Sequence, residues 1–506
     1  MNRLPGTLLA LVLAFASAAA QADTANSWLA LSADPLAEAG AESFEEIEGL
    51  PTAASPSTAN FVLQIGALEL PPAQPIAAVP ETVPEPVEAT QLADVLKRLD
   101  ALEKSMGKPA AAEKKPGDGW TDISGEKWTV KLGGHMQADY VLWPNTDPNI
   151  TDPSANNYFE FRRLRLLADG VGYGVFDFRI QIDIEPEEES PVTTPVTVIK
   201  DAYLTMHELP FCEQIRIGNF FVPFSLEQVT NDTNNIFLER SIPTTGVFAA
   251  DREVGVAFYG LRDDKRATWT TGVFFDSISE GTKERIDDNQ GTRVSGRATW
   301  LPYYDEPSNG RYLIHTGAGV LFTDDQDGLA RFRARPQVHE GPRLIDSGDL
   351  PASTYTNANV ELATVWGSFS AQSELFMSNV NLDNGDNVNL YGGYFYMSYF
   401  LTGENRIYER FGQHGAQFGR NVPYSNFFWV PGCCGPGAWE AKVRTSFLDL
   451  DEVNEGRYND LTAGFNWYWS DRTRIMFDWI HPWTSADAVF GETSSDLIGM
   501  RFDYNF

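Results

Sequence analysis

The stretch at residues 497–506 constrains the fold of this chain more than any other. Its sequence, LIGMRFDYNF, alternates strictly between two rows of side chains. One row is apolar and the other is polar or lacks a side chain: Ile498, Met500, Phe502, Tyr504 and Phe506 against Gly499, Arg501, Asp503 and Asn505. A period of two over this length predicts a β-strand with one apolar and one polar face. The apolar face must cover a protein core or contact lipid.

The same alternation recurs upstream, and we count sixteen predicted strands. They lie at residues 129–142, 158–168, 173–183, 197–207, 213–220, 254–261, 267–277, 292–301, 311–323, 355–366, 369–380, 388–401, 438–450, 461–469, 473–480 and 497–506. Short breaks, such as 366–368 and 470–472, alternate with long ones. Short turns at one end and long loops at the other are typical of bacterial outer-membrane barrels. The last strand, with its final aromatic residue, also resembles the terminal strand of such a barrel. We therefore predict an all-β fold, a 16-stranded antiparallel transmembrane β-barrel.

Charged residues indicate which side of the predicted strands faces inward. Lys442 and Arg444 alternate with apolar residues at 438–448. Because a charge in mid-membrane hydrocarbon costs roughly 2–4 kcal/mol, both should face a lumen that holds water. The adjacent Arg162 and Arg163 cannot both point inward in an ideal strand. This pair predicts a β-bulge, or a position at the lipid edge for one arginine.

Residues 1–118 have a different composition. A positive start at Arg3, an apolar stretch at 8–15 and small residues at 18–22 predict a signal peptide over 1–22, and hence an exported protein. Together with the predicted barrel, this places the protein in the cell outer membrane. Residues 23–118 are rich in Ala, Pro and Glu and predict a periplasmic linker. Within it, residues of about 91–107 predict a short coiled coil, or alternatively a lone amphipathic helix. Apolar residues occupy the a and d positions of this stretch: Leu92, Val95, Leu99, Leu102 and Met106. The barrel domain is expected at 119–506.

The composition of the chain limits which classes of partner it can bind. The chain has 506 residues and a formal net charge of −32, which makes nucleic acid an unfavourable partner. The 13 tryptophans fit aromatic girdles in contact with outer-membrane lipid. The three cysteines are Cys212, Cys433 and Cys434, too few for a disulfide framework, and His414 is the nearest further metal ligand. We predict no metal site and no cofactor.

Two connections are longer than the barrel requires. Residues 221–253 form the predicted third outer loop, and residues 403–437 lie at the periplasmic end, where turns should be short. We expect each of them to plug or constrict the lumen.

From about residue 130 onward, the chain resembles the phosphate-selective porin O and P family of outer-membrane porins. The resemblance lies in the order and spacing of short motifs: KLGGHMQADY at 131–140, FRR at 161–163, DAY at 201–203, IGNF at 217–220, PFSLE at 223–227, LER at 238–240, YFLTGE at 399–404, GAWE at 437–440 and GFNWY at 464–468. It implies a homotrimer of sixteen-stranded barrels, with the third loop folded into each pore.

The resemblance also implies pore residues. Arg162 and Arg163 match arginines of a phosphate-conducting ladder, and Arg240, Arg293 and Arg297 match further arginines. Asp201 matches the constriction carboxylate, and His135 stands at a further constriction position. For each arginine, the alternative is a salt bridge in the barrel wall. The chain departs from the family pattern where His135 replaces an arginine and where Gln228 and Thr233 replace third-loop lysines. Because rings of side-chain charge set porin selectivity, we expect phosphate selectivity to be weak or lost.

The sequence thus predicts a passive channel for small anions or solutes. Two alternatives stay open: a general porin without anion preference, and an envelope-tethering protein that acts through residues 23–118. We do not expect an enzyme, because the six histidines show no spacing typical of a nucleophile–His–acid site.

Overall fold

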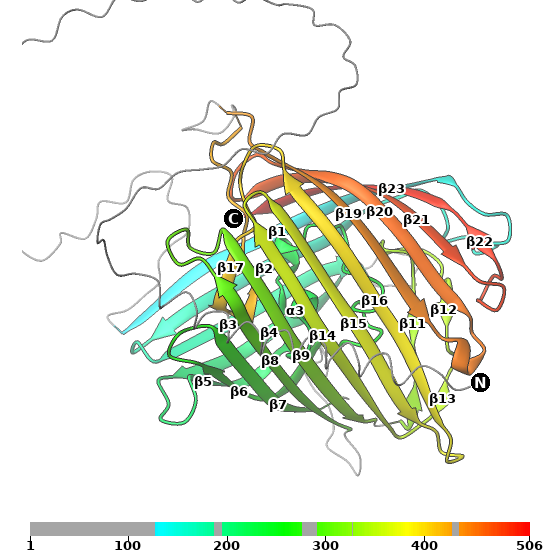
Figure 1. The fold of residues 1–506 in the computed structure, drawn as a ribbon, viewed down its shortest axis with the longest axis horizontal. Helices are drawn as coiled ribbons and strands as arrows, with labels where there is room; N and C mark the ends of the chain where they lie inside the picture. The colour runs from blue at the N-terminus through cyan, green and yellow to red at the C-terminus, as the bar shows by residue number, and fades with distance from the viewer. Residues whose placement is uncertain (1–126, 187–194, 276–290, 326, 428–434) are drawn as a thin grey trace, which may run out of the picture. The chain divides into compact units, whose positions relative to one another are not determined.

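The computed structural model describes residues 127–186, 195–275, 291–325, 327–427 and 435–506 (Figure 1). The predicted signal peptide, linker and coiled coil lie outside these ranges, as do Cys433 and Cys434, so the expectations that rest on them stay predictions. Among the described residues, no helix has the length and apolar character needed to cross a membrane.

Sixteen antiparallel strands form a closed barrel, as predicted (Figure 1). The first eight are β1 (Trp128–Asn145), β2 (Tyr158–Gly172), β3 (Phe176–Pro186), β4 (Pro195–His207), β5 (Gln214–Phe221), β6 (Arg252–Leu261), β7 (Ala267–Phe275) and β8 (Thr292–Tyr304). The other eight are β9 (Tyr312–Asp324), β14 (Thr354–Trp366), β15 (Phe369–Asn381), β16 (Asn387–Phe400), β19 (Ala438–Asp449), β20 (Arg457–Tyr468), β21 (Thr473–Thr484) and β23 (Asp496–Asn505). Each pairs with the next in chain order, and the short β22 (Thr493–Ser494) pairs with β21.

The seam of the barrel joins its last strand to its first. Strand β23 pairs with β1 in a register that places Arg501 opposite Asp139. Nε and Nη2 of Arg501 donate to the two carboxylate oxygens of Asp139, both at 2.6 Å. The outward row of β23 is exposed or half-buried, with Met500 48% accessible, while Arg501 and Asp503 are buried inside. The predicted lipid-facing and lumen-facing rows are therefore confirmed.

A β-bulge resolves the conflict between the two adjacent arginines of β2. Gln137 of β1 lies opposite Arg163 and Ala138 lies opposite Phe161, which leaves Arg162 as the extra residue. Both arginines consequently point inward, where Arg162 Nε lies 2.8 Å from Glu239 and Arg163 Nε lies 2.9 Å from Asp232. The predicted bulge is confirmed.

Three connections fold into the barrel. The loop between β5 and β6, residues 222–251, is termed L3 and contains α3 (Leu226–Val229) and the 3₁₀ turn η1 (Asp232–Asn234). The loop between β9 and β14, residues 325–353, is termed L5, and its β10 (Leu329–Ala330) and β11 (Arg333–Ala334) pair with β13 (Leu350–Pro351) and β12 (Ile345–Asp346). From the other end, β17 (Tyr408–Gly412) and β18 (Gly415–Phe418) form an inner hairpin. A further 3₁₀ turn, η2 (Asp451–Val453), lies between β19 and β20.

Buried polar and aromatic contacts fix L3 in the lumen. The carboxylate of Glu374, on β15, accepts the backbone N–H groups of Leu226 and Glu227 at 3.1 and 2.8 Å. These N–H groups at the start of α3 have no acceptor within the helix, and a negative charge is favourable there. Behind them, the ring of Phe248 stacks on Phe376 with centroids 6.1 Å apart. The barrel thus has a packed interior core.

Lys442 and Arg444 face the lumen as predicted, but L3 covers them. Lys442 Nζ lies 2.6 Å from Asp478, and Arg444 Nη1 donates to the backbone carbonyl of Glu239 at 2.9 Å. At this depth the inward charges are satisfied by protein groups, because L3 occupies the space that a wider pore would leave to water.

Candidate functional site

A polar cavity of about 630 Å³ lies between L3, L5 and the inner wall of the barrel. Of the described residues that line it, eleven are Arg or Lys and only four are Asp or Glu. The basic residues are Arg162, Arg163, Arg165, Lys200, Arg240, Arg252, Arg293, Arg331, Arg333, Arg335 and Arg343; the acidic ones are Asp232, Glu239, Asp251 and Glu253. A chain of net charge −32 therefore lines this cavity with an excess of basic side chains. Some of them pair with carboxylates outside the lining, as Arg165 does with Asp183 and Arg252 with Asp201.

Carboxylates of L3 hold the arginines of β2 in place. Asp232 lies between Arg163 and Arg165, with its Oδ2 at 2.9 Å from Nε of the first and 2.5 Å from Nη1 of the second. Glu239 lies 2.8 Å from Arg162 and 3.6 Å from Arg163. Fixed guanidinium groups of this kind present donors in a set geometry, which suits carboxylate or phosphate groups.

Arg240 adds positive charge from L3 itself. Its Nε donates to the carbonyl of Glu227 at 3.0 Å, and its Nη2 donates to those of Gln228 and Thr230 at 3.2 and 2.9 Å. These carbonyls belong to the end of α3, where a cation is favourable. Hydrogen bonds to neutral carbonyls leave the charge of the guanidinium in place, so Arg240 adds to the positive side of the cavity.

L5 contributes four arginines that the sequence reasoning missed. Arg331, Arg333, Arg335 and Arg343 all line the cavity. Two signals in the sequence could have found them. The gap between the predicted strands at 311–323 and 355–366 is as long as L3, and arginines recur in it with a period of two at 331, 333 and 335.

Four of the seven predicted pore residues line the cavity: Arg162, Arg163, Arg240 and Arg293. Asp201 lies behind it and accepts from Nε of Arg252 at 2.9 Å. His135 is buried on β1, opposite Arg165 in the strand register. Neither of these two side chains contributes to the cavity wall.

Arg297 lies elsewhere on the inner wall. It forms a fork with Glu361, at 2.7 and 2.9 Å, and donates to the carbonyl of Ala416 at 2.9 Å. Ala416 belongs to β18, so the inner hairpin covers Arg297.

A second, much smaller cleft lies on the other side of L3. It measures about 10 Å³, close to the space of one water molecule, and its lining includes Thr233 and Asn234 of L3. Among the residues that the structure describes, Arg420, Arg472 and Arg474 line it together with one acidic residue, Asp471. Since Asp232 lines the larger cavity and Thr233 the smaller cleft, L3 forms the boundary between two spaces with basic walls.

The inner hairpin narrows the lumen from the end that carries the short turns. Nε2 of Gln413 donates to the hydroxyl of Tyr203 at 2.8 Å, while its Oε1 accepts from Arg179 at 2.6 Å. Nδ1 of His414 lies 3.3 Å from Nη1 of Arg216. These contacts tie the hairpin to β3, β4 and β5. The hairpin also packs against L3, where Nδ2 of Asn234 donates to the carbonyl of Phe418 at 3.3 Å, so it forms a second obstruction next to L3.

Comparison with known proteins decides the family. The family model described as phosphate-selective porin O and P matches residues 130–506, which is nearly the whole barrel. The chain belongs to this family. It is an outer-membrane porin, and its barrel is a diffusion channel. An uncharacterized protein of Caulobacter vibrioides is 28% identical to this porin over 370 residues, which cover 70% of this chain and 69% of that protein.

Solved structures of porins and channels are also similar to this porin, at low identity. An anion-selective porin from Comamonas acidovorans is 13% identical, with a TM-score of 0.46 over 75% of this chain and 100% of the other. The outer membrane channel DcaP of Acinetobacter baumannii is 10% identical, with a TM-score of 0.46 over 76% of this chain and 100% of the other. The family assignment rests on the match over residues 130–506.

Proposed function

We propose that this porin conducts small anions in preference to cations, and that the cavity between L3 and L5 is its outer selectivity region. The observation that carries the proposal is the excess of basic side chains around the cavity, eleven against four. Rings of side-chain charge in a narrow, low-dielectric passage raise the local concentration of ions of opposite sign. The basic lining of the cleft beyond L3 supports the same preference along the rest of the path.

The anion path begins among the arginines of L5 and continues to the wall and L3, where Arg162, Arg163, Arg240 and Arg293 lie. Because Arg162 and Arg163 already pair with Glu239 and Asp232, an anion meets partly neutralised sites and binds each of them weakly. Several weak sites in series let an ion enter and still leave. Gln228 and Thr233 stand where the family resemblance implies lysines, with Asp232 beside Thr233, so phosphate has no particular advantage over other small anions.

A bilayer recording tests the sign of selectivity. In a KCl gradient, the reversal potential of the purified porin should show a preference for chloride over potassium. The variant Arg333→Glu changes the charge of the cavity wall by two. At about 8 Å from a permeating ion in a water-like dielectric, this change is worth about 1 kcal/mol, or roughly a five-fold shift of the permeability ratio toward cations.

Arg262→Glu is the matched control, because it makes the same change of charge at a side chain that is 68% exposed in the turn between β6 and β7. Its permeability ratio should stay close to that of the unaltered porin. Cation preference in the unaltered porin, or equal shifts in both variants, would show that the cavity does not set selectivity.

We further propose that the porin works as a homotrimer, as the family resemblance implies, and as a channel rather than an enzyme. Native mass spectrometry of the detergent-extracted protein tests the first point: three chains per particle are expected, and a monomer would contradict the proposal. The second point, that the porin works as a channel, is tested by measuring conductance in a lipid bilayer without added substrate.

A further inference from the structure

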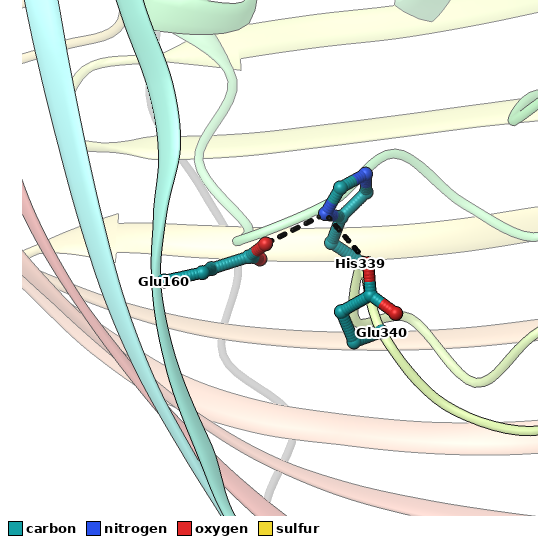
Figure 2. Close-up of side chains that lie close together, drawn as sticks. All are labelled: Glu160, His339 and Glu340. Carbon is teal, nitrogen blue, oxygen red and sulfur yellow. Dashed lines mark hydrogen bonds and ion pairs between the residues drawn. The ribbon is translucent and has the colours of Figure 1, made fainter. Parts of the chain in front are cut away.

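L5 rests on the barrel wall through a cluster of one histidine and two glutamates. His339 and Glu340 belong to L5, and Glu160 belongs to β2 (Figure 2). Nδ1 of His339 lies 2.8 Å from Oε2 of Glu160 and 3.7 Å from Oε1 of Glu340. One potential ligand atom from each residue can be chosen so that all three lie within 4.8 Å of one another.

The cluster contains a buried group whose bonding capacity is not used. The side chain of Glu160 is only 6% exposed. Its Oε2 is next to His339, but within the part of the chain that the structure describes, its Oε1 is buried without a hydrogen-bond partner. A buried carboxylate oxygen in this state is unfavourable unless a proton donor or a cation satisfies it. This oxygen of Glu160 can therefore accept a further proton donor or a cation.

The backbone beside the cluster is fixed by the same strand. The backbone N–H of Glu340 donates to the hydroxyl of Tyr158 at 3.2 Å, and Tyr158 and Glu160 lie two residues apart on β2. Successive inward side chains of one strand thus position both ends of the cluster. His339 also lines the cavity, so an ion can reach the imidazole from the lumen.

One imidazole nitrogen and two carboxylates form a donor set that suits Zn²⁺ and neighbouring divalent transition metals. Bonds of 2.0–2.2 Å in tetrahedral geometry place ligand atoms about 3.4 Å apart. The distance between His339 and Glu340 is near this value. The distance between His339 and Glu160 is shorter, so a movement of about 0.6 Å would admit the ion.

We propose that Glu160, His339 and Glu340 bind one divalent transition-metal ion, with Zn²⁺ as the best match, and that the ion fastens L5 to β2. A fourth position stays open toward the cavity for water or an anion, as in metal sites with three protein ligands. Because L5 carries Arg331, Arg333 and Arg335, the ion would also fix the loop that brings these charges to the cavity. The site does not depend on the anion preference proposed above.

Titration with zinc chloride alone tests the proposal. The full-length porin, purified in detergent without a polyhistidine tag, should bind one Zn²⁺ per chain in a saturable manner by isothermal titration calorimetry. Glu160→Gln and His339→Gln should each weaken binding roughly ten-fold or more, since each removes a ligand while keeping the side-chain size. The control is His481→Gln: His481 pairs with Asp496 at 2.9 Å, outside this cluster, and its loss should leave binding unchanged.

Two further measurements keep the outcome clear. Added Co²⁺ should give the visible absorption bands of a site with nitrogen and oxygen ligands, and His339→Gln should abolish these bands. Gel migration before and after heating shows whether the barrel of each variant is folded. A variant with Cys433→Ser and Cys434→Ser should bind Zn²⁺ as the unaltered porin does. Absence of saturable binding, equal binding in His339→Gln, or loss of binding in the cysteine variant would overturn the proposal.

Discussion

The guanidinium group of Arg297 lies in a buried network on the inner side of β8. Arg297 donates to both carboxylate oxygens of Glu361, and the same carboxylate lies 2.9 Å from Nε2 of His315. Arg293, four residues earlier on the same face of β8, lines the cavity instead. In the sequence these two arginines look equivalent. They differ because Ala416, 119 residues away, covers one of them.

Arg297→Ala should destabilise the porin without changing its ion preference. Removing one partner of a buried ion pair leaves Glu361 charged and uncompensated, which costs about 3–5 kcal/mol of the free energy of unfolding. Denaturant unfolding measures this loss. The exposed Arg262, 3.4 Å from Asp264, provides the comparison, since Arg262→Ala should change stability by less than about 1 kcal/mol. A shift of the reversal potential in Arg297→Ala, with little loss of stability, would place Arg297 in the ion path instead.

The site could be predicted from the sequence only in part. Arg162 and Arg163 could be predicted as pore residues, because the family resemblance matches them to ladder arginines. Their adjacency in a strand indicated either a bulge or a lipid-edge position for one of them. Arg333 could not be predicted as a pore residue in the same way, because the position of a loop residue depends on where the loop folds. Its period-of-two neighbours indicated a strand-like segment, but not that this segment would lie against L3.

At the scale of elements, the strands were predictable and the loop positions were not. Alternation identifies a strand where one face meets lipid, as in β19 and β23. It fails at the rims, where the outward face meets water instead of lipid. Strand β20 begins at Arg457, four residues before its predicted start, because outward Arg457 and Asn459 break the apolar row while Tyr458 and Asp460 continue the buried one. The length of L3 predicted that it enters the lumen. Its contacts with β2, β15 and β23 required the structure.

Glu239 is a charged link between L3 and two strands of the wall. It lies 2.8 Å from Arg162 on β2 and 2.8 Å from Arg501 on β23. Glu239→Gln keeps the size of the side chain and removes its charge, so both arginines lose a charged partner and L3 is held less firmly. We expect increased open-channel current noise and faster proteolysis within L3.

Glu306→Gln serves as the control for this change, because Glu306 pairs with Arg410 at 2.9 Å at a position that is 52% exposed. An exposed pair of this kind contributes little to stability. If Glu239→Gln and Glu306→Gln gave the same noise and the same proteolysis rate, L3 would not depend on Glu239.

At the scale of the whole molecule, the chain carries a net negative charge, whereas the charged side chains that line its cavity are mostly basic. The net charge of −32 is summed over all 506 residues, whereas the basic side chains gather around the cavity between L3 and L5 and the small cleft beyond L3. Distant charges act on an ion only within the screening length, which is about 10 Å at 0.1 M salt and about 3 Å at 1 M. The local arginines therefore outweigh the net charge of the chain.

Anion preference should consequently weaken as salt is raised. Between 0.1 M and 1 M KCl, the permeability ratio from reversal potentials should fall toward the ratio of the bulk mobilities, because screening shortens the reach of the cavity charges. Arg333→Glu should show a smaller change over the same range, since it starts with less positive charge. A ratio independent of salt would indicate selection by pore size instead.

The seam between β1 and β23 has a consequence for the order of assembly. Nη1 of Arg501 donates to the carbonyl of Leu238, and its Nη2 lies 2.8 Å from Glu239, so L3 satisfies the same guanidinium that joins the two strands. Gly499 makes room for this contact, because a Cβ atom there would lie 2.2 Å from a side-chain carbon of Leu238. A seam that closed before L3 entered would leave these donors of Arg501 to water, without the acceptors that L3 supplies. Barrel closure and loop entry therefore stabilise each other during biogenesis, because the entry of L3 adds buried hydrogen bonds at the seam.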